Sequence, residues 1–134
     1  MQLASLADTR SFAATLLPRL TPGTLLLLDG PLGAGKTAFV RGLAEGVGAD
    51  PADVSSPTFA ILQQYGGAPQ LYHADLYRLT PAEVVDLGLE EMGLDGVLAV
   101  EWPDRWNARP VTAHRVVIED RGGDERRISI YSTR

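Results

Sequence analysis

Short apolar runs, separated by glycine, proline and polar clusters, predict alternating strands and helices along the chain. The run Thr24–Asp29 is mostly leucine and lies between Gly23 and Gly30, as expected for a strand buried on both faces of a sheet. Residues 97–100 form a second uniformly apolar run, which ends at Glu101. Buried strands of this kind are typical of a parallel sheet in an α/β protein.

Helices are predicted in three places. Asp8 is positioned to cap a helix that runs to about Leu20. Thr80, followed by proline, opens another helix that extends through Asp86, with Glu83 as its third residue in a capping-box pattern. Between them, a helix ended by Gly46 and Gly48 is indicated by apolar residues near helical spacing: Ala38, Val40, Leu43, Ala44 and Val47.

The remaining apolar segments are short and predict marginal strands. They are residues 1–4, a hairpin of residues 60–65 and 70–75, and a terminal hairpin of residues 116–118 and 128–130. The predicted fold is a mixed α/β sheet, mostly parallel at its centre, flanked by helices and with antiparallel strands at its margins. We expect one domain spanning residues 1–134.

Composition limits the classes of function. The formal net charge of -5 argues against a protein that binds nucleic acid through its own surface field. The absence of cysteine excludes disulfides and thiolate zinc sites. The amino-terminal residues lack a basic region, and no apolar run is long enough to span a membrane. We therefore expect a soluble cytoplasmic protein with no membrane partner.

Lys36 is the only lysine, whereas eleven arginines carry the other basic charges. It lies in Gly30–Thr37, which reads G-x-x-x-x-G-K-T, the phosphate-binding loop of P-loop NTPases. Glycines let successive backbone N–H groups surround phosphate oxygens, and a compact ammonium fits where a planar guanidinium is too wide. Strand, loop and helix follow in the required order. The expected nucleotide-binding residues are Gly33, Ala34, Gly35, Lys36, Thr37 and Ala38.

Phosphate chemistry of this kind uses Mg²⁺, which needs oxygen ligands near the loop. Thr37 supplies a hydroxyl, and an acid is expected at the carboxyl end of a neighbouring strand. Asp75 and Glu101 both qualify. The strand before Glu101 is more uniformly apolar, which favours Glu101 for the metal. Asp75 is then assigned to orienting or deprotonating the attacking water. For both acids, a solvated side chain at a strand end is the alternative.

Other residues carry weaker signals. Thr58 follows a proline in a segment that could reach the γ-phosphate like a switch threonine, or could form a turn. His73 and Asp75 share a strand face, either as a metal pair or, more often, as a hydrogen-bonded structural pair. Trp102 and Trp106 flank a short segment after the presumed metal acid. They could fill the core or contact a nucleotide or partner.

Taken together, several motifs resemble the TsaE family of small bacterial ATPases of tRNA threonylcarbamoyladenosine biosynthesis. They occur in the family's order and spacing over nearly the whole chain: the phosphate loop, Ser56-Pro-Thr-Phe59, the HxDxYR pattern of residues 73–78, Leu87-Gly-Leu-Glu90 and Val100-Glu-Trp-Pro103. The HxDxYR pattern and the last of these segments are far more specific than the phosphate loop alone.

The resemblance implies an ATPase that hydrolyses ATP with Mg²⁺, weakly by itself and faster with partner proteins. It implies TsaB and TsaD as partners, with tRNA reached only through the complex, and leaves self-association open. By motif, Lys36 matches the phosphate lysine, Thr37 and Glu101 the magnesium residues, and Asp75 a residue needed for hydrolysis. The predicted catalytic residues are Lys36, Asp75 and Thr58.

Three other classes of protein compete with this interpretation. A GTPase would read guanine with an N-K-x-D motif. This class is excluded, because the only lysine already lies in the phosphate loop. A small-molecule P-loop kinase is the main alternative, since Arg78 could stabilise a transferring phosphoryl group. The chain leaves little room for an acceptor site and a lid. A non-hydrolysing nucleotide-sensing adaptor would bind ATP without turning it over.

Overall fold

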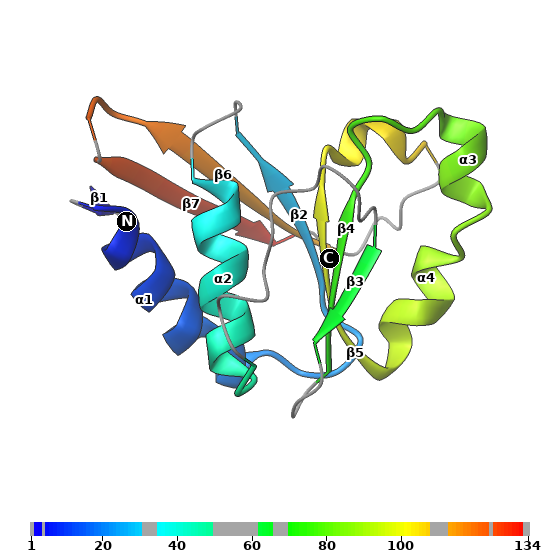
Figure 1. Ribbon diagram of the computed structural model, residues 1–134, viewed down its shortest axis with the longest axis horizontal. Coiled ribbons are helices and arrows are strands. Elements are labelled where there is room, and N and C mark those ends of the chain that lie inside the picture. The colour runs from blue at the N-terminus through cyan, green and yellow to red at the C-terminus, as the bar shows by residue number, and fades with distance from the viewer. Residues whose placement is uncertain are drawn as a thin grey trace.

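The computed structural model describes residues 2–3, 5–30, 35–49, 62–65, 70–107, 113–123 and 125–132. Within them the strands form one seven-stranded sheet in the order β1-β7-β6-β2-β5-β4-β3 (Figure 1). In chain order the strands are β1 (Gln2–Leu3), β2 (Leu25–Asp29), β3 (Leu62–Tyr65), β4 (Gln70–Asp75), β5 (Gly96–Glu101), β6 (His114–Asp120) and β7 (Arg126–Ser132).

The centre of the sheet is parallel and its margins are antiparallel, which confirms the predicted fold class. Strand β2 pairs in parallel with β5 and β6, and β5 pairs in parallel with β4. The pairs β3–β4, β6–β7 and β1–β7 are antiparallel. The two predicted hairpins are therefore present, and the buried strands at residues 24–29 and 97–100 are β2 and β5.

The described helices are short. The α-helices are α1 (Leu6–Leu16), α2 (Lys36–Gly46), α3 (Pro81–Val85) and α4 (Leu89–Met92). Single 3-10 turns lie at η1 (Leu17–Arg19), η3 (Gly93–Asp95) and η4 (Pro103–Arg105). None of the helices among the described residues has the length and apolar character that a membrane span requires.

Alternation along the strands divides the core into two layers, one on each face of the sheet. Leu26 and Leu28 of β2 pack in a cluster with residues of α1 and α2, such as Leu43. Leu25 and Leu27 pack in a second cluster that includes residues of α3 and α4. The sheet is thus covered by helices on both faces (Figure 1), which explains why its central strands read as continuous apolar runs.

Helices α1 and α2 approach closely because glycines of α2 face α1. A Cβ atom on Gly42 would lie 2.1 Å from the carbonyl oxygen of Arg10, and one on Gly46 would lie 2.9 Å from the carbonyl oxygen of Ala14. Backbone therefore packs against backbone at this contact. The contact fixes the axis of α2 and so the position of its first turn, where Lys36 lies.

Two details of α1 differ from the sequence prediction, and α4 was not predicted. Ser5, not Asp8, caps α1, since its side chain accepts a hydrogen bond from the Asp8 N–H. Asp8 instead lies in the first turn, where its negative charge suits the helix dipole. The α-helix ends at Leu16 and continues to Arg19 as a 3-10 turn. At Thr80 the predicted capping box is confirmed.

Candidate functional site

Three acidic residues end neighbouring strands at one edge of the sheet. Asp75 is the last residue of β4 and Glu101 the last of β5, and the two are register partners. Asp29 ends β2, one residue beyond the partner of Glu101. His73, Asp75 and Glu101 alternate with residues that face α3 and α4, so they point to the side of the sheet covered by α2. The predicted gathering of acids at the carboxyl edge is therefore observed.

The predicted phosphate-binding residues fall partly within the described chain. Gly35 precedes α2 with φ of 107°, a left-handed conformation that favours glycine. Lys36, Thr37 and Ala38 form the first turn of α2, where free backbone N–H groups and the helix dipole favour an anion. Gly33 and Ala34 lie outside the described residues, as does Thr58.

Lys36 is almost fully buried, with 5% of its surface exposed. Its Nζ atom lies 4.0 Å from the ring centroid of Trp102. Burial lowers the pKa of Lys36, and the carboxylates of Glu101, Asp75 and Asp29 act in the opposite direction. The ammonium is thus held beside the acidic edge of the sheet and against an aromatic face.

Trp102 has an unusual backbone conformation. Its φ is 58°, and among the described residues no other non-glycine residue has positive φ. Such strain is often retained at functional sites. The Tyr77 ring packs on the Trp102 indole with 4.9 Å between centroids. Trp106, by contrast, is buried in the core with 5% exposure, so the two tryptophans have different roles.

Glu101, the residue before Trp102, is paired with His73. The His73 Nε2 and Glu101 Oε2 atoms are 2.6 Å apart, and both side chains are at most 5% exposed. His73 therefore pairs with Glu101 on the adjacent strand. The prediction that His73 and Asp75 share one face of the strand is confirmed. The hydrogen-bond partner of His73, however, is Glu101 of β5 and not Asp75.

Asp75 is also buried, with 7% exposure. Its Oδ1 atom accepts a hydrogen bond of 2.9 Å from the Tyr77 N–H. Burial raises the pKa of the Asp75 carboxyl above its ordinary value, and the nearby charge of Glu101 adds to this. The Tyr77 hydrogen bond, His73 and Lys36 oppose the rise. A buried carboxylate with a raised pKa suits a group that accepts a proton from water.

The chemistry of these groups fits a magnesium ion shared with a ligand. One hydroxyl on Thr37 and one buried carboxylate on Glu101 are hard oxygen donors. Within the described ranges, no group of three or more His, Cys, Asp or Glu side chains is arranged to hold a metal by itself. Mg²⁺ in nucleotide sites commonly takes one or two protein ligands and completes its shell with phosphates and water, so the donor set matches that use.

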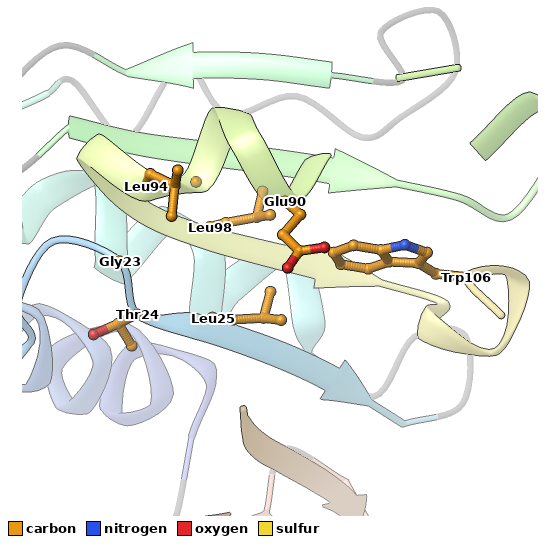
Figure 2. A pocket seen from close by; sticks show the side chains of 8 residues that line it. Gly23, Thr24, Leu25, Glu90, Leu94, Leu98 and Trp106 are labelled. Atoms are coloured by element: carbon orange, nitrogen blue, oxygen red, sulfur yellow. The ribbon is translucent and has the colours of Figure 1, made fainter. Parts of the chain in front are cut away.

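A cavity of about 150 Å³ lies on the face of the sheet covered by α3 and α4, and its lining includes the residues that precede β2. Figure 2 shows Leu25 and Leu98 at this cavity with the Trp106 ring, and Glu90 beside that ring. Among the described residues, the polar side chains in its lining are those of Glu90 and Thr24 and the indole N–H of Trp106. It lacks a cation for phosphate, and the candidate site is therefore the acidic edge around Lys36.

Sequence reasoning missed two polar pairs between neighbouring strands at the site. Asp29 pairs with Arg115 of β6, which follows from the parallel pairing of β2 and β6. His73 pairs with Glu101 because β4 and β5 lie side by side in register. Predicting either pair requires knowing the order of the strands in the sheet. The only signal in the sequence was the presence of polar residues on otherwise apolar strands.

A family model described as "Threonylcarbamoyl adenosine biosynthesis protein TsaE" matches residues 3–128. The chain is 38% identical to the tRNA threonylcarbamoyladenosine biosynthesis protein TsaE of a Nostoc species, over 97% of this chain and 85% of that protein. It is 42% identical to the protein of the same name from Bacillus subtilis, over 91% of this chain and 78% of that protein.

The fold is similar to a solved structure, the crystal structure of YdiB from Bacillus subtilis. The TM-score is 0.83 at 34% sequence identity, and the match covers 100% of this chain and 84% of the other. The similarity therefore extends over the whole sheet and the helices around Lys36.

Proposed function

The chain belongs to the TsaE family, and we propose that it is the Mg²⁺-dependent ATP-binding and ATP-hydrolysing subunit of the system that forms threonylcarbamoyladenosine in tRNA. In that system it would serve the transfer of a threonylcarbamoyl group to the adenosine beside the anticodon. The observation that supports ATP hydrolysis is the grouping of Lys36, Asp75 and Glu101 around the first turn of α2.

Each residue has a distinct role in the proposed reaction. The Lys36 ammonium binds the β- and γ-phosphates, and backbone N–H groups of residues 33–38 surround their oxygens. The Thr37 hydroxyl and the Glu101 carboxylate hold Mg²⁺. When bound, the metal neutralises charge on the phosphate oxygens. Thr58 belongs to the segment proposed to reach the γ-phosphate.

Asp75 acts on the attacking water. It accepts a hydrogen bond from the water and takes its proton as the water oxygen bonds to the γ-phosphorus. The bond from that phosphorus to the bridging oxygen breaks, leaving ADP and inorganic phosphate. The raised pKa of Asp75 makes the carboxylate a better proton acceptor than an exposed aspartate.

We propose that two proteins, TsaB and TsaD, work with this chain and that tRNA is reached only through the complex. The formal net charge of -5 supports this arrangement, because an acidic chain has little attraction for the tRNA backbone by itself. A cytoplasmic location belongs to the same proposal. Tight, salt-sensitive binding of tRNA by the isolated chain would contradict it.

The reaction is tested by following ATP consumption with Mg²⁺, with excess chelator, and with Lys36→Ala. We expect release of inorganic phosphate that requires Mg²⁺ and Lys36. A small-molecule kinase would instead consume ATP only when an acceptor is present, without releasing free phosphate. Binding of ATP with no consumption in any of these mixtures, partners included, would indicate a nucleotide-sensing adaptor.

A further inference from the structure

We propose that His73 is a positioning residue that fixes the Glu101 carboxylate for the metal ion. The inference rests on the proposed function, since it concerns how Glu101 is held in the site that binds Mg²⁺ and ATP. It assigns a role to a side chain that the proposed reaction does not use.

The geometry of the pair is the first support. The Nε2 atom of His73 and the Oε2 atom of Glu101 are 2.6 Å apart, and the two residues lie 28 positions apart in the sequence. A carboxylate has no proton to give, so the imidazole N–H is the donor. The contact is short, as hydrogen bonds to charged acceptors are, and it restrains the Glu101 side chain.

The position of the pair in the sheet is the second support. Parallel pairing sets His73 opposite Ala99, two residues before Glu101, and sets Asp75 opposite Glu101 itself. His73 therefore lies two residues farther from the carboxyl end of the strands than the acid it contacts. Its neighbour on β5 is the small residue Ala99, and the imidazole reaches along the sheet to Glu101.

The chemistry of the carboxylate is the third support. Glu101 has two oxygen atoms, each able to accept more than one hydrogen bond or a metal. Fixing Oε2 on His73 leaves Oε1 with the capacity to face a cation or its bound water. Groups that hold a ligating carboxylate are worth about 10–100-fold in metal affinity or activity. A glutamate free to change rotamer would lose that advantage.

The test compares two amides that differ in reach. His73→Gln carries its amide nitrogen near the place of Nε2, whereas His73→Asn withdraws it by one methylene. Mg²⁺ is titrated into each variant with a saturating non-hydrolysable ATP analogue, and the apparent Mg²⁺ affinity is measured by calorimetry. We expect His73→Gln to remain within about threefold of the parent and His73→Asn to lose about tenfold or more.

Tyr72→Phe is the matched control. It removes a side-chain hydrogen bond of 2.9 Å to Asp95 from the adjacent position of the same strand, on the opposite face of the sheet. It should lower thermal stability but leave Mg²⁺ affinity unchanged. If His73→Asn lowers stability alone, as Tyr72→Phe does, the pair is merely structural and the inference is wrong.

The outcomes separate this inference from the proposed function. If the parent binds Mg²⁺ with the analogue and Glu101→Ala loses that binding, while both His73 variants keep it, only the positioning role fails. If His73→Gln loses as much affinity as His73→Asn, the donor at Nε2 is not the determinant and the inference fails again. If the parent shows no Mg²⁺-dependent nucleotide binding, the proposed function fails and the inference with it.

Discussion

The ammonium nitrogen of Lys36 lies 4.0 Å from the ring centroid of Trp102, and it also interacts electrostatically with the carboxylates of Glu101 and Asp75. A cation–π contact of this kind contributes about 0.5–2 kcal/mol. Hydrogen bonds from an ammonium to phosphate oxygens contribute about 1.5–3 kcal/mol each. Bound nucleotide should therefore draw Lys36 away from the indole.

Trp102 should report this movement. In a Trp106→Phe variant, Trp102 is the only tryptophan, so its fluorescence can be followed as a non-hydrolysable ATP analogue is added. We expect a saturable change in emission. In the same background, Lys36→Met lacks the ammonium and should show no such change. Emission that stays constant while calorimetry shows saturation would mean that Lys36 does not leave the ring.

Lys36 should not be replaceable by arginine. Lys36→Ala removes the ammonium, and Lys36→Arg keeps a positive charge on a planar group that is too wide for the loop. We expect both variants to lose at least about tenfold in ATP affinity by calorimetric titration, from the loss of one or more charge-assisted hydrogen bonds. Parent-like affinity in Lys36→Ala would show that the nucleotide binds elsewhere.

Asp75→Asn should separate binding from turnover. The asparagine keeps an oxygen that can accept the hydrogen bond from the Tyr77 N–H, so the local backbone should be preserved. It has no carboxylate to take a proton from water. We expect ATP affinity within a few-fold of the parent and a rate of phosphate release reduced by about 10²–10⁴-fold. An unchanged rate would remove Asp75 from the mechanism.

The same substitution should stabilise the fold at neutral pH. Burial raises the pKa of Asp75 in the folded state, so the ionised form is disfavoured there and stability falls as pH rises through that value. Asp75→Asn should have the higher free energy of unfolding at pH 7, and the difference should vanish below about pH 4. The free energy of unfolding is measured with denaturant for the parent and the variant between about pH 4 and pH 7. Asp86→Asn, at an exposed position, is the control for loss of a surface charge. A difference independent of pH would show that the buried charge of Asp75 is not its cause.

Gly42→Ala should weaken the contact between α1 and α2. The added Cβ would lie 2.1 Å from the Arg10 carbonyl oxygen, so the helices must move apart. Overpacking of this kind costs about 1–3 kcal/mol in the free energy of unfolding. Glu45→Ala on the same helix loses only an exposed ion pair to Arg10 and should cost less than about 1 kcal/mol. Equal losses in the two variants would show that the close approach is not limiting.

Local features of the fold were readable from the sequence. Residues 25–28 of β2 are all leucine because helices cover both faces of the sheet, and the capping box at Thr80 involves residues three apart. The choice of Ser5 over Asp8 was missed because both are good caps and only backbone geometry separates them. Helix α4, with four residues, is too short to show a period.

The site was predictable only as far as strand ends could be located. Asp75 and Glu101 follow strands, so their meeting at one edge could be inferred. The pairing of His73 with Glu101 depends on which strands are neighbours. The contact of Lys36 with Trp102 depends on a left-handed backbone at a tryptophan, which local propensity disfavours.

The most direct test of the central claim is the ATP turnover of this chain, measured alone and then with TsaB, TsaD and tRNA. We predict slow Mg²⁺-dependent hydrolysis by the isolated chain, a marked increase on adding the partner proteins, and formation of threonylcarbamoyladenosine that is lost with Lys36→Ala. A rate of ATP hydrolysis that does not change when the partner proteins are added would contradict the proposed function. Modified tRNA formed equally well with the Lys36→Ala chain would also contradict it.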